Sequence, residues 1–137
     1  MSRTLGIDFG SKRVGLALSD RLNLIASPYR TLDYVSEKEL IAQLKSIVYE
    51  NNIEIVVLGL PINMKGEDTI QTKKVRNFKK LLSGLGLPVI YEDERLSSIS
   101  AKNSLVLQNI KTGHHKGAID RTAAAIILQQ YLDKSSN

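Results

Sequence analysis

The sequence predicts an α/β protein in which helices flank a mixed five-stranded sheet, with elements in the order β-β-β-α-β-α-β-α-α. Three observations support this class. The 137 residues have the length of one domain with a hydrophobic core, so we expect residues 1–137 to form a single domain. Short apolar runs fill the first third, and helical and strand patterns alternate afterwards.

The first third is predicted to form three strands. Apolar runs cover residues 3–9 and 13–20, and Gly10-Ser11-Lys12 between them is typical of a hairpin turn. Residues 26–34 supply the third strand. We therefore expect an antiparallel hairpin at the start of the sheet.

Helical spacing begins near Ser36, which with Glu39 has the spacing of a capping box, and it continues to about residue 51. Residues 54–60 follow as an Ile/Val-rich strand buried on both faces. A second helix is expected over residues 68–83. Its inward side chains would be Val75, Phe78 and Leu82.

The last third is predicted to contain a strand at residues 87–91 and helices at 96–108 and 119–132. Pro88 cannot donate a ladder hydrogen bond, so this strand should start there or lie toward a sheet edge. Parallel crossovers join the later strands, and ligand chemistry is expected at the carboxyl ends of the central strands.

Composition excludes several kinds of site. The chain has no cysteine, which rules out disulfides, thiolate nucleophiles and cysteine-ligated metals, and His114 and His115 are its only histidines. Any metal must therefore be held mainly by oxygen ligands. No apolar run is long enough for a signal peptide or a membrane span, so a cytoplasmic location without membrane partners is expected.

The charge is positive and unevenly placed. The net charge of +5 favours an anionic partner only weakly, but residues 69–91 contain no acid. Lys73, Arg76 and Lys80 fall on one helical face, which suits a phosphate backbone, although a solvated face is the open alternative. Lys12, Arg13 and Lys116 add charge in loops. Aromatic residues make up only 5% of the chain, so base stacking should not dominate binding.

Asp8 is unusual for its place in an apolar strand. Alternation puts Leu5, Ile7 and Phe9 on one face and Asp8 on the other, between Gly6 and Gly10, where a ligand has room to approach. A carboxylate in a central strand is costly unless it is paired or metal-bound. A role in capping the following turn is the alternative.

Two further acidic sites lie in other elements. Asp120 shares a helical stripe with Ala123, Ala124 and Ile127, and the two small alanines would let the helix bring Asp120 close to the sheet. Favourable interaction with the helix dipole explains Asp120 equally well. The segment Glu92-Asp93-Glu94-Arg95 follows the fifth strand, and spacing alone does not choose among its acids. Together these sites would allow an oxygen-ligand Mg²⁺ or Mn²⁺ centre for phosphoryl displacement.

With these residues assembled, the chain resembles the YqgF family, which has an RNase H-like fold and is described as pre-16S rRNA nucleases and, earlier, as Holliday junction resolvases. The resemblance covers nearly the whole length. The matching segments are Leu5-Gly6-Ile7-Asp8-Phe9-Gly10-Ser11-Lys12-Arg13-Val14-Gly15, Gly59-Leu60-Pro61, Asp93-Glu94-Arg95-Leu96-Ser97-Ser98 and Asp120-Arg121-Thr122-Ala123-Ala124.

The resemblance implies a metal-dependent nuclease in which Asp8, Glu94 and Asp120 are the catalytic acids and hold Mg²⁺ or Mn²⁺. It selects Glu94 and implies precursor 16S rRNA as the substrate, with the ribosome as a further partner. The expected nucleic-acid-binding residues are Lys12, Arg13, Lys73, Arg76, Lys80, Arg95 and Lys116.

Three alternatives remain open. One is a resolvase that acts on branched DNA, for which a two-fold dimer is expected, whereas the rRNA nuclease could be a monomer or a homodimer. Another is a ribosome- or RNA-binding module without catalysis. Phosphotransfer of the actin or sugar-kinase kind also uses Asp-x-Gly on a first hairpin, but it requires two lobes and this chain supplies at most one.

Overall fold

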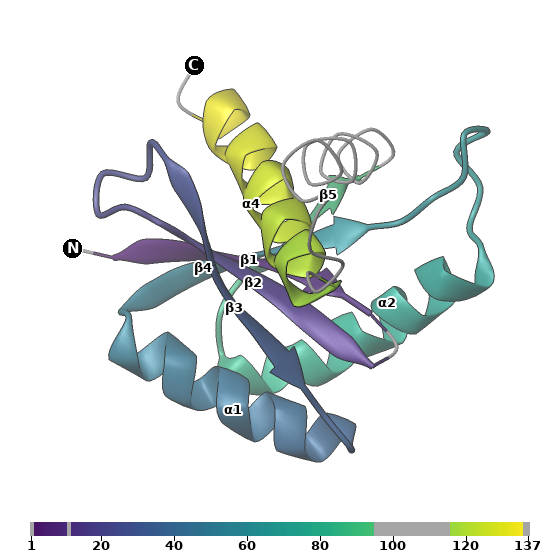
Figure 1. Cartoon of the computed structure of the whole chain (residues 1–137), viewed down its shortest axis with the longest axis horizontal. Coiled ribbons are helices and arrows are strands. Elements are labelled where there is room, and N and C mark those ends of the chain that lie inside the picture. Colours follow the sequence, from purple (N-terminus) through teal and green to yellow (C-terminus); the bar gives the residue numbers. More distant parts are fainter. Residues whose placement is uncertain (1, 11, 95–115, 136–137) are drawn as a thin grey trace.

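A five-stranded mixed sheet forms the centre of the computed structural model, which describes residues 2–10, 12–94 and 116–135 (Figure 1). The spatial order is β3-β2-β1-β4-β5. Neighbours β1/β2 and β2/β3 are antiparallel, and β1/β4 and β4/β5 are parallel, which confirms the predicted first hairpin and the later parallel strands. The strands are β1 (Arg3–Phe9), β2 (Arg13–Ser19), β3 (Ala26–Asp33), β4 (Ile53–Leu60) and β5 (Val89–Asp93).

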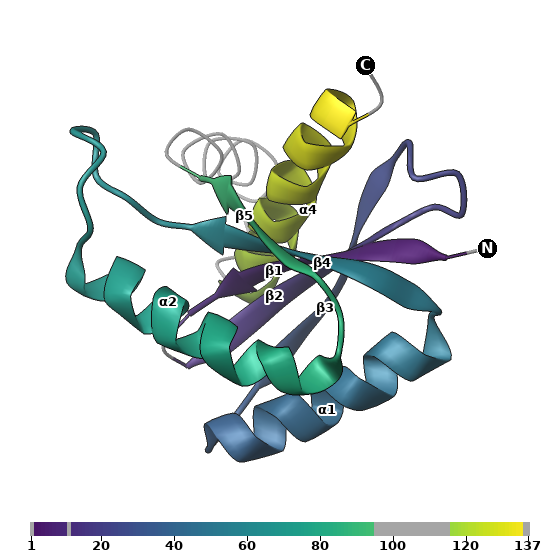
Figure 2. The ribbon, with the colours of Figure 1, turned by 180° about the vertical axis from the view of Figure 1, so that it is seen from behind.

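Helices cover both faces of the sheet (Figures 1 and 2). On one face lie α1 (Glu37–Glu50) and α2 (Ile70–Leu82), which continues into the short 3-10 helix η1 (Ser83–Leu85). The other face carries α4 (Lys116–Ser135). The predicted helix at 96–108 lies outside the described residues. Among the residues described, no helix is long and apolar enough to cross a membrane.

Alternation along β1 divides the core into two layers. Leu5, Ile7 and Phe9 are buried with the inward residues of α1 and α2, including Phe78, whose ring stacks on Phe9 with centroids 4.1 Å apart. The opposite layer is thinner and is built on Ala17 and Val57 together with α4. This second layer contains the face on which Asp8 lies.

Side-chain caps fix where the first two helices begin. The Ser36 hydroxyl accepts a hydrogen bond from the Glu39 backbone N–H at 3.2 Å, as its position in the sequence predicts. Thr69 and Thr72 form a reciprocal capping box at the start of α2, and the Thr72 hydroxyl also donates to the carbonyl of Pro61. These bonds fasten the start of α2 to the end of β4.

The edge strand β5 differs from the prediction at its end. It begins after Pro88, whose carbonyl accepts from the Val56 N–H, and it continues to Asp93, two residues beyond the predicted strand. Pairing with β4 extends to Leu60↔Asp93, because the parallel neighbour supplies ladder partners that far. The acidic segment therefore begins inside the sheet instead of in a solvated turn.

Glycines set how closely α4 approaches the sheet. A Cβ at Gly15 would lie 2.1 Å from the carbonyl oxygen of Asp120, and one at Gly6 would lie 2.8 Å from the Cβ of Leu128. Both distances are shorter than real contacts, so the helix rests directly on the backbones of β2 and β1.

We expect Gly15→Ala to destabilise the protein by about 1–3 kcal/mol, since the blocking atom is a backbone carbonyl that cannot rotate away. Urea denaturation followed by circular dichroism measures this change. Gly84→Ala is the matched control, because a Cβ there meets nothing within 4 Å. Equal stability of the two variants would contradict the close contact between α4 and β2.

Candidate active site

Asp8 lies between two glycines at the carboxyl edge of the sheet. The antiparallel register pairs it with Gly15 of β2. On the other side, the parallel register reaches Ile7↔Leu58, so Gly59 is the next residue of β4 beside Asp8. Neither neighbour has a side chain, and the surface around the Asp8 carboxylate is therefore left to groups from other elements.

Glu94 occupies the space above Gly59. A Cβ added to Gly59 would lie 2.3 Å from Glu94 Oε2. The backbone N–H of Glu94 donates to the carbonyl of Leu60 at 3.3 Å, which extends the β4–β5 pairing and turns this side chain toward β1. Gly59 thus makes room for a carboxyl group next to Asp8.

The two carboxyl groups repel each other when both are ionised. Burial raises the pKa of Glu94 from 4.5 to about 8, with further contributions from the negative charge of Asp8, a hydrogen bond between the two side chains and the charge of Asp93. Glu94 Oε2 is buried and has no hydrogen-bond partner. A proton or a cation is therefore needed to stabilise this pair.

Asp120 comes from the first turns of α4, whose backbone rests on Gly15 opposite Asp8. Its carboxylate accepts a hydrogen bond from Nε of Arg13 at 2.9 Å. In the part of the chain that the structure describes, no three acidic or histidine side chains are arranged as a ready metal site. Asp8 and Glu94 are in contact, whereas the carboxylate of Asp120 is bonded to Arg13.

The other acids of the segment have different surroundings. Glu92 is 5% exposed, and its carboxylate accepts a 2.6 Å hydrogen bond from the ammonium group of Lys134 near the end of α4. This ion pair joins β5 to α4 and gives Glu92 a structural partner. Glu94 is in contact with Asp8, and its role as the catalytic acid that the resemblance implies stays a prediction.

The predicted basic residues are spread over both faces of the sheet. Lys12 is exposed in the β1–β2 turn, and Arg13 lies beside the acids. Lys73 and Lys80 are exposed on α2, which covers the face opposite α4. Their roles in nucleic-acid binding stay predictions, as do those of Arg95 and the Lys116 side chain, which lie outside the described residues.

Arg76 has partners within the protein. Its guanidinium donates to both carboxylate oxygens of Asp68, at 2.7 and 3.0 Å, and it lies over the ring of Tyr91. At the carboxyl edge of the sheet, Gln71 near the start of α2 donates to the carbonyl of Phe9 at 2.9 Å. Lys80 is about 10 Å further along the helix axis than Lys73, away from the acids.

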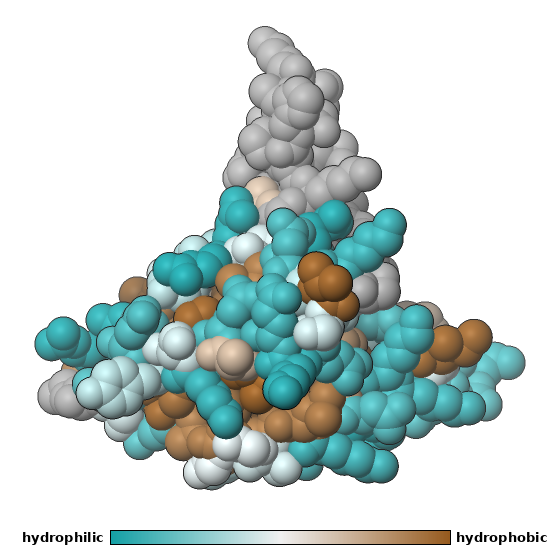
Figure 3. Space-filling model, turned by 90° about the horizontal axis from the view of Figure 1, so that it is seen from below, coloured by the Kyte–Doolittle hydropathy of each residue, from teal (hydrophilic) through white to brown (hydrophobic). Residues whose placement is uncertain are grey.

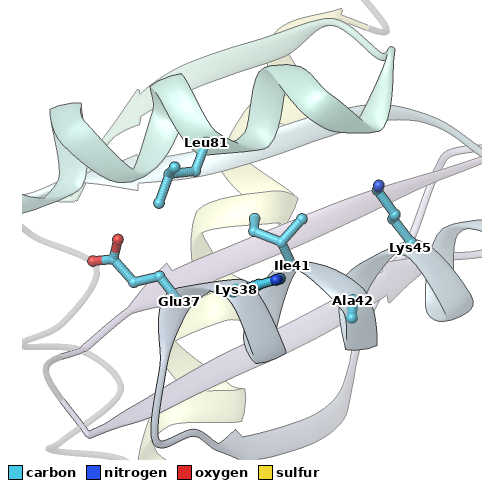
Figure 4. Close-up of a pocket in the computed structure, with 6 residues that line it drawn as sticks. All are labelled: Glu37, Lys38, Ile41, Ala42, Lys45 and Leu81. Carbon is cyan, nitrogen blue, oxygen red and sulfur yellow. The ribbon is translucent and has the colours of Figure 1, made fainter.

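A separate groove runs between α1 and α2 on the side away from the acids (Figure 4). Its volume is about 520 Å³, and Figure 4 shows Leu81 and Ile41 pointing into the space between the helices. Seen from this side of the molecule, hydrophobic side chains gather within a largely hydrophilic surface (Figure 3). The groove has no acidic pair like that of Asp8 and Glu94, so it is not the candidate active site.

Sequence reasoning alone missed the Arg13–Asp120 ion pair and the roles of Gly15 and Gly59. The hairpin turn at residues 10–12 was the signal for Gly15, because folding the chain there pairs residue 8 with residue 15. Gly59 had no such local signal, since its position beside Asp8 depends on a crossover between distant strands.

Comparisons with known proteins identify the family of this chain. The family model described as "RuvX: Holliday junction resolvase" matches residues 2–134. A protein of Trichormus variabilis named "Putative pre-16S rRNA nuclease" is 44% identical over 130 residues, which cover 94% of this chain and 86% of that protein. A protein of Dictyoglomus thermophilum with the same name is 40% identical and covers 98% of this chain and 97% of its own length.

Solved structures show the fold. The RuvC protein of T. thermophilus in complex with a Holliday junction substrate superposes with a TM-score of 0.61 at 15% identity, covering 100% of this chain and 97% of that one. The yeast mitochondrial Holliday junction resolvase gives a TM-score of 0.61 at 14% identity, with coverage of 98% and 79%. These likenesses confirm the RNase H-like fold, and the family match over nearly the whole chain shows that this protein belongs to the RuvX family, also called YqgF.

Proposed function

We propose that this protein is a metal-dependent nuclease that hydrolyses phosphodiester bonds in structured nucleic acid. The observation that carries this proposal is the buried, unpartnered Oε2 of Glu94 next to Asp8 at the carboxyl edge of the sheet. A pair of carboxyl groups in this environment is unfavourable by itself and becomes favourable when a cation lies between them. Asp120 would be the third acid, because its backbone rests on Gly15, the residue of β2 that pairs with Asp8.

The donor set fits Mg²⁺ or Mn²⁺, because all three candidate ligands, Asp8, Glu94 and Asp120, offer hard carboxylate oxygens. A divalent cation bound there would activate water and neutralise the charge that develops on the phosphate. The protein's own contribution is to place one acid near the end of β1, one just after β5 on the far side of Gly59 in β4, and one on α4. Arg13 and Lys12 lie at the same edge and would attract the phosphate backbone.

We further propose precursor 16S rRNA as the substrate, with cleavage at its 5′ end during ribosome assembly in the cytoplasm. The names of the relatives at 40–44% identity support this choice. Branched DNA is the second candidate substrate, and the description of the matching family favours it. A resolvase would require a two-fold dimer matched to a four-way junction.

Cleavage assays test the activity and select the substrate. The purified protein is incubated with a precursor small-subunit rRNA fragment and with a synthetic four-way DNA junction, each with Mn²⁺ or with chelator. We expect Mn²⁺-dependent cutting of one substrate, and Asp8→Asn and Glu94→Gln should reduce its rate by at least about 100-fold, since even the loss of groups that support metal ligands costs 10–100-fold.

Asp133→Asn is the matched control, because Asp133 is exposed and lies about 20 Å along α4 from Asp120. It should cut at the wild-type rate. Binding of either substrate without metal-dependent cutting by the wild type would instead support a binding module.

The Glu94 carboxyl should make stability depend on pH in metal-free buffer. Its pKa is raised in the folded protein, so the folded state holds this proton more tightly, and its contribution to stability is lost as pH rises from 4.5 to about 8. Glu94→Gln should therefore exceed the wild type by a few kcal/mol at pH 8 and match it near pH 4.5. Denaturant unfolding at a series of pH values measures this difference.

Glu54→Gln, a change at an exposed carboxyl, controls for charge removal and should follow the wild-type pH profile. A Glu94→Gln profile parallel to that of the wild type would contradict the burial of an acid pair.

A further inference from the structure

The Arg13–Asp120 ion pair lies at the boundary between the acids and the solvent. Arg13 is two residues before Gly15 on β2, so both face α4, and the backbone of Asp120 rests on Gly15. The side chains of Arg13 and Asp120 are 35% and 24% exposed. A nucleic-acid phosphate could therefore reach the guanidinium without any change in the fold.

The ion pair is not what holds α4 in place. The sheet-facing side of α4 is fully buried at Ala124, Ile127 and Leu128. At the far end of the sheet, the Gln129 side chain accepts from the Ala26 N–H and donates to the Leu24 carbonyl. The Lys134–Glu92 pair adds a further attachment. The Arg13–Asp120 contact can open while these contacts keep the helix seated.

The Asp120 carboxylate has two competing positive partners. One is Arg13, which holds it in the described structure, and the other is the divalent cation of the proposed nuclease site beside Asp8 and Glu94. A bound cation would repel the guanidinium, whereas a phosphate group would offer it a charge-assisted and bidentate partner.

We propose that Arg13 is a positioning residue that holds Asp120 in the absence of nucleic acid. When a backbone phosphate replaces Asp120 as the partner of the Arg13 guanidinium, Asp120 is released to the cation. This inference rests on the proposed function. With Arg13 in this role, the cation site is complete only when substrate is present. By linkage, the cation and the nucleic acid each strengthen the binding of the other.

Mn²⁺ titrations of the full chain by calorimetry test the release of Asp120. Without nucleic acid, Arg13→Gln should tighten Mn²⁺ binding by up to about fivefold, the factor that corresponds to an exposed ion pair of about 1 kcal/mol. The wild type should gain affinity for Mn²⁺ when the precursor small-subunit rRNA fragment is added, and Arg13→Gln should gain less. Because the proposed activity would cut this RNA, the titrations are repeated with RNA that the protein has already cut to completion, so that the measured heat is that of binding alone.

Two variants separate the ion pair from a general effect of charge. Arg121→Gln removes a neighbouring positive charge that bonds to Thr31 of β3, and it should leave the Mn²⁺ affinity closer to the wild-type value than Arg13→Gln does. In an Asp120→Asn background the effect of Arg13→Gln should vanish, because the carboxylate that Arg13 holds is gone.

The outcomes distinguish this inference from the proposed function. If Asp8→Asn binds Mn²⁺ as tightly as the wild type, the cation site itself is absent and the proposed function fails. If the wild type binds Mn²⁺ at Asp8 but Arg13→Gln leaves its affinity unchanged or weaker, the positioning role is overturned. The positioning role is also overturned if the effect of Arg13→Gln persists in the Asp120→Asn background.

Discussion

The close approach of α4 to the sheet is the constraint on which the candidate site depends. Glycines on β1 and β2 remove the side chains that would keep the helix at an ordinary distance, so its backbone contacts the strands directly. This contact carries Asp120 to the strand that pairs with Asp8. With a side chain at Gly15, the helix would have to shift, and the acid would move with it.

The candidate site also holds two carboxyl groups that repel each other when both are ionised. Gly59 admits the Glu94 carboxyl beside Asp8, and burial there makes ionisation of both groups unfavourable. The fold compensates for this cost elsewhere with two packed layers of apolar side chains. Two buried carboxyl groups that repel each other are typical of a functional site, because a ligand of opposite charge removes the repulsion.

Positive charge is distributed more widely than the acids. Arg13 is the basic side chain that the described structure shows in contact with a candidate acid, whereas α2 presents its lysines on the other side of the sheet. Electrostatic attraction acts over about 10 Å at moderate ionic strength, so under the proposed function α2 would attract a nucleic acid without touching the phosphate to be cleaved. The two basic regions would then serve different purposes, long-range attraction and local positioning.

Residue types and local periodicity were enough to predict the order of the strands and helices that the structure describes, the inward faces of α2 and β1, and the exclusion of sulfur and histidine-rich metal sites. The sequence also marked Asp8 and Asp120 as unusual, and the family resemblance selected Glu94. The folded arrangement was needed to show that Glu94 lies over Gly59, that Asp120 is held by Arg13 and that Arg76 is paired with Asp68. The Glu94 and Asp120 contacts join residues far apart in the chain, and the Arg76 contact depends on the geometry of the β4–α2 connection, so no local pattern encodes any of them.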